Sequence, residues 1–373
     1  MKVGLDVSAV PAHLAGAGRY IVELARRLPS YDVDTTLVTR SDDALRWAQW
    51  SPSSTISSIV PSSRVPRIVY EAYQLGASRT ARAVDVWHAP HYTMPRRGAT
   101  PTVVTIHDLT FFTNPDWHER SKVAFFRRAI AYSSRHAKVL VSVSDFTARQ
   151  IDEFLPGHAP VVVAPHGVDL ERFTTIEADD GRLFIDHGLP IGVPYIFFLG
   201  TVEPRKGLDV LLAAFAEVAS TDTSVELWIA GQAGWGLEEF DAELLRHSAS
   251  ARIRRLGFVA EEVLPALLRQ SKVVAYPSRG EGFGLPVLEA LACGAVVVTS
   301  RGTVMEEVAG TTARFVDVGD HEGLASELLE SMNLNTEQRA QISLAARERA
   351  EGFTWGASLR QHLVAYNLAQ SGV

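Results

Sequence analysis

The sequence contains a single cysteine, Cys293, which excludes an internal disulfide and a zinc site built from several cysteines. Because Cys293 lies in an apolar run, we expect it to be a small core residue. No 18-residue apolar stretch is present, so no membrane-spanning helix is predicted. The first residues lead directly into an expected strand, without the apolar core of a signal peptide, which favours a cytoplasmic protein.

An excess of positive charge is also lacking, since 36 Lys and Arg stand against 43 Asp and Glu. Residues 1–183 carry 21 basic and 19 acidic side chains, whereas residues 184–373 carry 15 and 24. The acidic second part argues against a nucleic-acid partner. The basic pairs Arg96–Arg97 and Arg127–Arg128 are either solvated helix faces or contacts to an anionic membrane surface.

Clustered metal ligands are missing as well. No set of Asp, Glu or Cys at ligand spacing joins His88, His91 and His107, so we predict no metal site. The chain also has no Gly-x-Ser-x-Gly elbow, which leaves hydrolase chemistry of that type without support.

A length of 373 residues predicts two domains, because single cores rarely grow beyond about 250–300 residues. Apolar runs of strand length alternate with helical patterns, which predicts parallel α/β units. The polar segment 174–186 is the expected linker. We therefore predict an α/β protein with Rossmann-like domains at 1–183 and 184–354, and a helix at 355–373 that packs back on the first domain. The expected strands are 3–7, 36–39, 84–87, 102–106, 139–143, 161–164, 195–199, 225–230, 273–275 and 296–298.

The most informative stretch is 276–290, in which an apolar strand end is followed by a Gly-rich loop and an apolar helical pattern. Pro286 suits the first turn of that helix. Glu281 then lies in the loop and Glu289 about one turn inside the helix. Carboxylates at the carboxyl edge of a sheet suit sugar hydroxyls, and free amides at a helix N-terminus suit phosphate. The pattern indicates a sugar-nucleotide site, the alternative being an ordinary helix N-terminus stabilised by acids.

Two further features follow apolar strands in the same way. Arg205 and Lys206 come shortly after the strand at 195–199, where a planar guanidinium and a mobile ammonium would suit phosphate. A solvated basic turn is the alternative. His107 directly follows the strand at 102–106, where a lone histidine has either a structural or a site role.

The pair Glu281 and Glu289 resembles the Glu-x7-Glu signature of retaining glycosyltransferases of family 4. The segments 16–20, 165–169 and 198–207 also resemble segments of that family, and the resemblance covers nearly the whole chain. It implies a GT-B architecture, in which two Rossmann-like domains face each other across a cleft. The sequences of these motifs are similar to those of bacterial mannosyltransferases of cell-surface polysaccharide synthesis.

The resemblance implies a role for each matching residue. Arg205 and Lys206 would bind the donor pyrophosphate, Arg205 substituting for the Arg that many members have where this chain has Thr201. Glu289 would bind the donor ribose, and Glu281 the hydroxyls of the transferred sugar. His107 would orient that sugar beside its anomeric carbon. The remaining expected donor contacts are Gly16, Gly18, Gly200, Gly282, Phe283, Gly284 and Leu285.

The implied activity is transfer of a hexose, with mannose favoured, from a nucleotide-diphosphate sugar, with GDP-mannose favoured. The acceptor would be a glycan or lipid-linked hydroxyl in the synthesis of cell-surface polysaccharide or glycolipid. No metal or other cofactor is expected. Peripheral contact with the inner face of an anionic membrane is expected. The alternatives are a UDP-glucose-dependent, glycogen-synthase-like enzyme and a sugar-nucleotide epimerase of similar shape.

Overall fold

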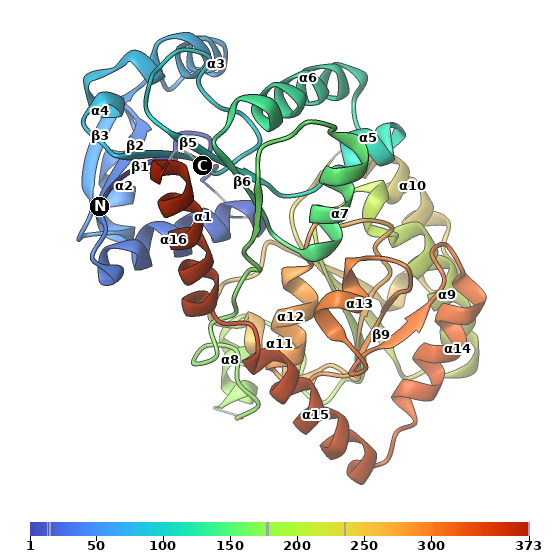
Figure 1. Ribbon diagram of the computed structural model, residues 1–373. Coiled ribbons are helices and arrows are strands. Elements are labelled where there is room, and N and C mark those ends of the chain that lie inside the picture. The colour runs from blue at the N-terminus through green and yellow to red at the C-terminus, as the bar shows by residue number, and fades with distance from the viewer. Residues whose placement is uncertain (13, 15, 177–178, 235, 372–373) are drawn as a thin grey trace. The chain divides into compact units, whose positions relative to one another are not determined.

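The computed structural model describes residues 1–12, 14, 16–176, 179–234 and 236–371, which form two α/β units (Figure 1). Unit 1 runs from Met1 to Gly167 and resumes at Trp355, and unit 2 spans Val168–Thr354. The sequence pattern predicts the first boundary after residue 183, whereas the structure divides after Gly167. The reason is tertiary: Arg269 holds Asp180 through a 3.0 Å hydrogen bond from its Nε, which fastens this polar segment to unit 2.

Unit 1 is built on a parallel sheet whose central strands are buried on both faces, as expected when helices cover both sides. Within the described residues its strand order is β3-β2-β1-β4-β5-β6-β7. The strands are β1 (Lys2–Asp6), β2 (Asp34–Arg40), β3 (Thr55–Val60), β4 (Val86–Ala89), β5 (Thr102–Ile106), β6 (Val139–Ser142) and β7 (Val161–Val163).

The helices of unit 1 lie on the two faces of this sheet, over two separate apolar clusters. They are α1 (Gly16–Arg27), α2 (Ala44–Trp50), α3 (Arg64–Tyr73), α4 (Arg79–Arg82), α5 (Thr110–Thr113), α6 (Arg120–His136), α7 (Asp145–Phe154) and α16 (Trp355–Ser371). None of the helices in the described part of the chain is long and apolar enough to cross a membrane.

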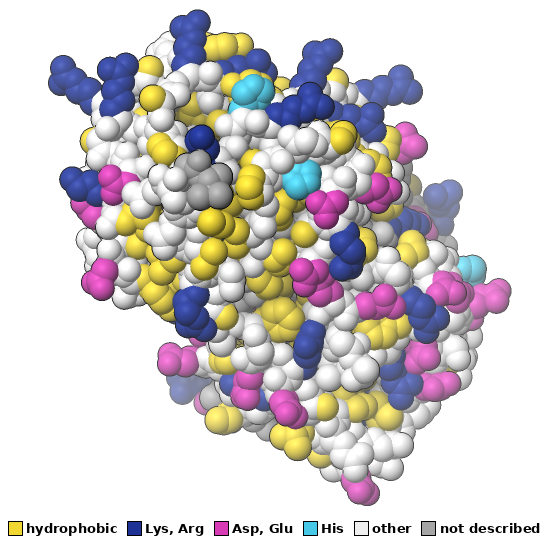
Figure 2. Space-filling view, in the orientation of Figure 1, with side chains coloured by type: hydrophobic (Ala, Val, Ile, Leu, Met, Phe, Trp, Pro, Cys, Tyr) yellow, Lys and Arg dark blue, Asp and Glu magenta, His cyan; other side chains and the backbone are white. Residues whose placement is uncertain are grey.

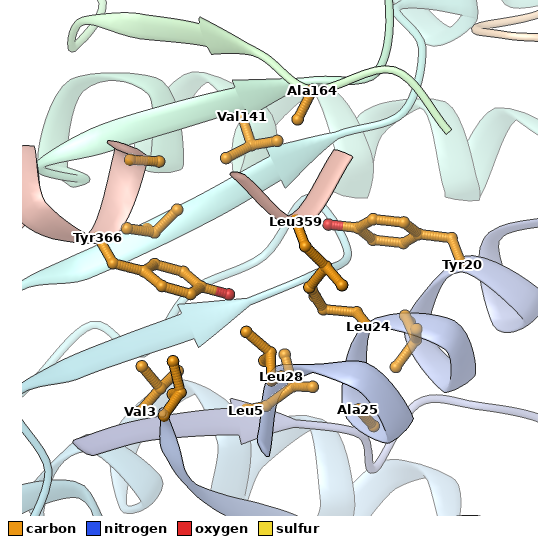
Figure 3. Close-up of a cluster of buried hydrophobic side chains, with 14 of the residues drawn as sticks. Val3, Leu5, Tyr20, Leu24, Ala25, Leu28, Val141, Ala164, Leu359 and Tyr366 are labelled. Atoms are coloured by element: carbon orange, nitrogen blue, oxygen red, sulfur yellow. The ribbon is translucent and has the colours of Figure 1, made fainter. Parts of the chain in front are cut away.

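The C-terminal helix α16 returns to unit 1 and packs on its sheet and on α1. Leu359 and Tyr366 of α16 enter the same cluster as Leu24 of α1 and Val141 of β6 (Figure 3). Leu359 is 1% exposed and Tyr366 is fully buried, so the helix is an integral part of the core of unit 1.

Unit 2 has a second parallel sheet, whose order within the described residues is β10-β9-β8-β11-β12-β13. Its strands are β8 (Tyr195–Leu199), β9 (Glu226–Ala230), β10 (Ile253–Gly257), β11 (Val273–Tyr276), β12 (Val297–Ser300) and β13 (Arg314–Val316). Its helices are α8 (Asp180–Asp186), α9 (Leu208–Thr221), α10 (Leu237–Arg246), α11 (Leu264–Gln270), α12 (Leu285–Ala292), α13 (Val304–Ala309), α14 (His321–Met332) and α15 (Thr336–Glu351).

Helix α12 begins and ends as its sequence predicts. Gly284 precedes it with φ of 100°, and Pro286 lies in its first turn, where no amide hydrogen is needed. Gly294 follows it with φ of 70°, a left-handed conformation that suits glycine. Cys293 at the C-cap is buried, which confirms the expected core residue, and burial raises the pKa of its thiol to about 12.

Candidate functional site

Two neighbouring strands of unit 2, β8 and β11, bring two loops together at the carboxyl edge of the sheet. The first loop leads from Gly200 to a short helical turn, Pro204–Lys206, and the second spans residues 277–284 before α12. Gly207 has φ of 70°, and a Cβ there would lie 2.1 Å from the carbonyl oxygen of Pro277. Only glycine permits this close approach of the two loops. They lie at the carboxyl edge of the sheet, where α/β proteins bind ligands.

Glu281 lies at the centre of this edge, between the two predicted phosphate-binding cations. Its carboxylate accepts a hydrogen bond from Arg205 Nη1 at 2.8 Å and another from Lys206 Nζ. The side chains of Glu281 and Lys206 are only 11% and 9% exposed. Arg205 Nε also pairs with Glu203 Oε2 at 2.9 Å, so the four side chains form a largely buried cluster with no formal net charge.

Two hydroxyl groups complete the surroundings of Glu281. Its Oε1 accepts hydrogen bonds from Tyr276 Oη at 3.0 Å and Ser278 Oγ at 3.1 Å. Lys206 Nζ donates to the same Tyr276 oxygen at 2.9 Å. The carboxylate is thus held by groups from both loops, so its position is fixed before any ligand arrives.

These contacts fix the charge states. Burial alone would raise the pKa of Glu281, but the charges of Arg205 and Lys206 and their hydrogen bonds outweigh burial and bring this pKa to about 2. Burial lowers the pKa of Lys206, and Arg205 acts in the same direction, while Glu281 opposes both. An ionised carboxylate opposite two cations is the result at neutral pH.

Helix α12 contributes the second carboxylate. Glu289 lies inside the helix and is 4% exposed. Gly284, at the helix N-terminus, has φ of 100°, which larger residues rarely adopt, and a Cβ there would lie 2.7 Å from Met305 Sδ. Gly282, Phe283 and Leu285 flank it, so the loop expected to contact the donor lies directly beside Glu281.

In unit 1, His107 follows β5 as predicted and is 7% exposed. Burial lowers its pKa to about 4, with the nearby His91 acting in the same direction, so the ring is neutral at pH 7. Its Nε2 lies 2.8 Å from the carbonyl oxygen of Pro90, which can only accept a hydrogen bond. The proton of the neutral ring is therefore on Nε2, and Nδ1 is left as an acceptor.

Family models account for most of the chain. Residues 14–172 match the model described as Glycosyltransferase Family 4, and residues 180–349 match the one described as Glycosyl transferases group 1. The chain belongs to the family 4 glycosyltransferases. Its two units, each with a parallel sheet, have the GT-B fold of that family.

Individual relatives agree with this assignment. The glycosyltransferase is 27% identical to the O-antigen chain mannosyltransferase B of Escherichia coli, over 99% of this chain and 100% of that protein. It is 28% identical to a D-inositol 3-phosphate glycosyltransferase of Salinispora arenicola, over 98% and 91% of the two chains. Its fold is similar to that of Anabaena HepE in complex with UDP and glucose, with a TM-score of 0.77, 20% identity and 98% of both chains covered.

The glycosyltransferase brings most of its predicted site residues together in unit 2, with one unforeseen feature. The sequence pattern assigns Arg205 and Lys206 to phosphate and Glu281 to sugar hydroxyls, as separate groups. In the structure Glu281 pairs with both cations. The partners Tyr276 and Ser278 were missed, although both lie in the informative stretch, because a tyrosine ending a strand has no distinctive local pattern.

Gly16 and Gly18, two of the expected donor contacts, lie in a helix. Both glycines belong to the first turn of α1, which begins at Gly16, and Gly18 is buried. A Cβ at Gly18 would lie 3.2 Å from Leu14 Cδ2, so this glycine permits close packing at the start of the helix. Gly16, Gly18 and His107 all belong to unit 1, and their contact with a donor stays a prediction.

A buried hydrogen-bonded chain in unit 1 was also missed. His88 contacts Tyr366 Oη at 2.9 Å through Nδ1 and Thr105 Oγ1 at 2.8 Å through Nε2. Thr105 Oγ1 lies 2.9 Å from Tyr20 Oη, which lies 2.8 Å from Nε2 of His362. Burial lowers the pKa of His88, and it lowers that of His362 to about 4, so the chain is neutral and links α1, β4, β5 and α16.

A second cluster at the carboxyl end of β1 joins two carboxyl groups through one hydroxyl. Ser8 Oγ lies 2.6 Å from Asp6 Oδ1 and 2.7 Å from Glu71 Oε1. A hydroxyl has one hydrogen, so one of the two carboxyls must itself carry a proton to complete both contacts. Burial and the charge of Asp6 raise the pKa of Glu71 to about 7, while Ser8 and Arg67 oppose them.

Among the side chains that the structure describes, no three His, Cys, Asp or Glu residues converge in a way that could hold a metal ion. Metal independence stays a prediction that chelation can test.

Proposed function

We propose that the chain is a retaining hexosyltransferase that moves mannose from GDP-mannose to a hydroxyl of a glycan or lipid-linked acceptor. The observation that carries this proposal is the buried cluster of Arg205, Lys206 and Glu281 beside the N-terminus of α12. Two cations at a helix N-terminus suit a diphosphate, and adjacent carboxylates suit sugar and ribose hydroxyls. The full-length similarity to a protein named as a mannosyltransferase supports the choice of sugar.

The chemistry assigns a task to each group. As the bond between the anomeric carbon and the phosphate oxygen breaks, its electron pair stays on the departing diphosphate. Arg205, Lys206 and the amides before α12 stabilise that charge in a site of low dielectric. The acceptor oxygen bonds to the anomeric carbon on the same face, and its proton passes to the departing phosphate oxygen.

Glu281 keeps the two cations from repelling each other before the donor binds, because it pairs with both. Its position also lets it accept hydrogen bonds from hydroxyls of the transferred sugar. Glu289 is assigned to the ribose. In unit 1 the acceptor-capable Nδ1 of His107 is assigned to the transferred sugar, and the first turn of α1 at Gly16 to the donor phosphate.

The cellular context follows from the acceptor. A lipid-linked or surface glycan under synthesis places the enzyme in the cytoplasm at the inner face of the membrane. We assign acceptor binding to unit 1, and no metal ion or further cofactor takes part.

A second candidate is a UDP-glucose-dependent glucosyltransferase, which the fold similarity to HepE with UDP and glucose favours. A thermal-shift screen with GDP, UDP, GDP-mannose and UDP-glucose separates the two. A ligand at 100 times its Kd adds about 2.7 kcal/mol to stability, which gives a measurable shift. Stabilisation by the uridine compounds alone would select the second candidate. Conversion of the donor sugar without any acceptor, seen by NMR, would instead indicate an epimerase.

The proposal is tested by Arg205→Ala and Lys206→Ala. Each is expected to reduce transfer by at least about a hundredfold, because loss of one charge-stabilising group costs roughly 10²–10³. Arg301→Ala is the matched control, since Arg301 pairs with Asp317 on an exposed surface and should leave transfer unchanged. Transfer within about threefold of wild type for both site variants would contradict the assigned role.

A further inference from the structure

Helix α3 exposes several of its apolar side chains to solvent. None of its ten residues is buried, although its sequence is mostly apolar and aromatic. Val65, Val69 and Tyr73 are 71%, 48% and 47% exposed. They are spaced by four residues, so they lie along one face of the helix. We name this set the α3 stripe.

The charged residues of α3 that face the protein explain this orientation. Arg67 and Glu71 have side chains that are only 20% exposed. Glu71 Oε1 accepts a hydrogen bond from Ser8 Oγ at 2.7 Å, and Arg67 Nη1 donates to the carbonyl oxygen of Ser8 at 3.4 Å. Polar contacts to the end of β1 therefore hold the helix with its valines turned outward.

The surroundings of the α3 stripe are basic. Residues 64–138 contain 12 Lys and Arg against 5 Asp and Glu, in a chain whose net charge is −7. Figure 2 shows dark blue Lys and Arg side chains gathered along the upper edge, over the part of unit 1 where Figure 1 places α3 and α6. Phe125 of α6 adds an exposed aromatic ring, 44% accessible. The exposed basic residues of this segment are Arg64, Arg79, Arg82, Arg96, Arg97, Arg120, Arg128, Arg135 and Lys138.

We propose that the α3 stripe inserts into the headgroup region of an anionic bilayer, with the surrounding arginines on lipid phosphates. Exposed valines and a tyrosine beside a broad basic surface have the composition of an interfacial helix. Each basic side chain near an anionic surface adds attraction that salt weakens. A second copy of the chain is a less suitable partner for the α3 stripe, because two such basic surfaces would repel each other. This inference deepens the membrane contact of the proposed function and rests on no choice of donor or acceptor.

The test is co-sedimentation with vesicles of phosphatidylcholine alone or mixed with phosphatidylglycerol. Wild type should bind the anionic vesicles, and binding should fall as salt is raised. The double variant Val65→Ser with Val69→Ser should bind up to about 100-fold more weakly, roughly tenfold for each valine withdrawn from the interface. Val69→Trp should bind more tightly, because Trp favours the interface.

Matched controls lie on other exposed surfaces. Leu245→Ser and Leu344→Ser remove apolar side chains that are 84% and 72% exposed on α10 and α15, and should leave vesicle binding unchanged. Because the α3 valines are exposed, their variants should keep the wild-type melting temperature. Transfer to a water-soluble acceptor should also be unchanged, which separates this inference from the proposed function.

Equal binding of wild type and the double variant to anionic vesicles would overturn the inference. So would a lack of wild-type binding to vesicles of every composition. Concentration-dependent dimers in lipid-free solution that the double variant abolishes would assign the α3 stripe to a second copy instead.

Discussion

Neutralising Glu281 should destabilise unit 2 by an amount that the structure allows us to estimate in two ways. The pKa of Glu281 moves from an ordinary 4.5 to about 2, which corresponds to about 3 kcal/mol of stabilisation of the ionised form. Removing one partner from a buried ion pair costs about 3–5 kcal/mol, because the other charge stays buried. Glu281→Gln should therefore cost about 3 kcal/mol at pH 7.

The pH dependence of this difference has a definite sign. The folded pKa of Glu281 lies below the unfolded value, so its stabilising contribution is present above about pH 4.5 and is lost as the pH falls toward about 2. The difference in unfolding free energy between wild type and Glu281→Gln should therefore decrease over the same pH range. A general packing defect would leave this difference independent of pH.

Hydrogen exchange is the suitable assay, because it measures the opening of unit 2 separately from unit 1. Amides of β11 and α12 should exchange about a hundredfold faster in Glu281→Gln. The matched control is Asp209→Asn, whose side chain pairs with Arg279 but is 51% exposed, so its loss should cost at most about 1 kcal/mol. A change for Glu281→Gln as small as that of the control would refute the ion-pair argument.

Three further predictions concern binding, acid sensitivity and metal. Glu289→Gln should weaken binding of the bare nucleoside diphosphate. Glu281→Gln should reduce transfer while leaving that affinity largely intact, since both cations remain. Calorimetry with the diphosphate and with the donor tests this division, and an equal loss of diphosphate affinity in both variants would contradict it. Unit 1 should lose stability as the pH falls from about 6.5 toward 4, because burial lowers the pKa of His107 and that of His362 to about 4 and the unfolded chain binds protons that the folded one excludes. The loss is on the order of 3 kcal/mol for each ring. An opening free energy of β5 that does not change with pH, after exchange rates are corrected for the intrinsic pH dependence of amide exchange, would contradict this. Transfer should persist in EDTA, and its loss and rescue by a divalent cation would overturn metal independence.

Local patterns predicted the central strands and the helix at the site. The runs at 102–106 and 195–199 are apolar throughout because both sheet faces are covered, and β5 and β8 occupy the same residues. The missed strands β3, β10 and β13 are all edge strands. Their sequences alternate or mix polar residues, as in the two arginines of β10, so no continuous apolar run marks them.

Long-range pairings account for the rest of what the sequence did not predict. Glu281 and Lys206 are 75 residues apart, and His88 and Tyr366 are 278 apart, so no local pattern records either contact. The first domain boundary was misplaced for the same reason, because Arg269 of α11 decides where Asp180 belongs. Local patterns therefore identify candidate site residues, but not the distant residues that contact them.

The return of α16 to unit 1 has a consequence for the order of folding during synthesis. Unit 2 is continuous and is complete once Thr354 has been made. Unit 1 begins first but lacks Leu359, His362 and Tyr366 until the last helix leaves the ribosome. Its buried His88 and Tyr20 have no α16 partners until then, so the N-terminal unit is the last to close. A nascent chain stalled near residue 354 would expose an open apolar core to chaperones.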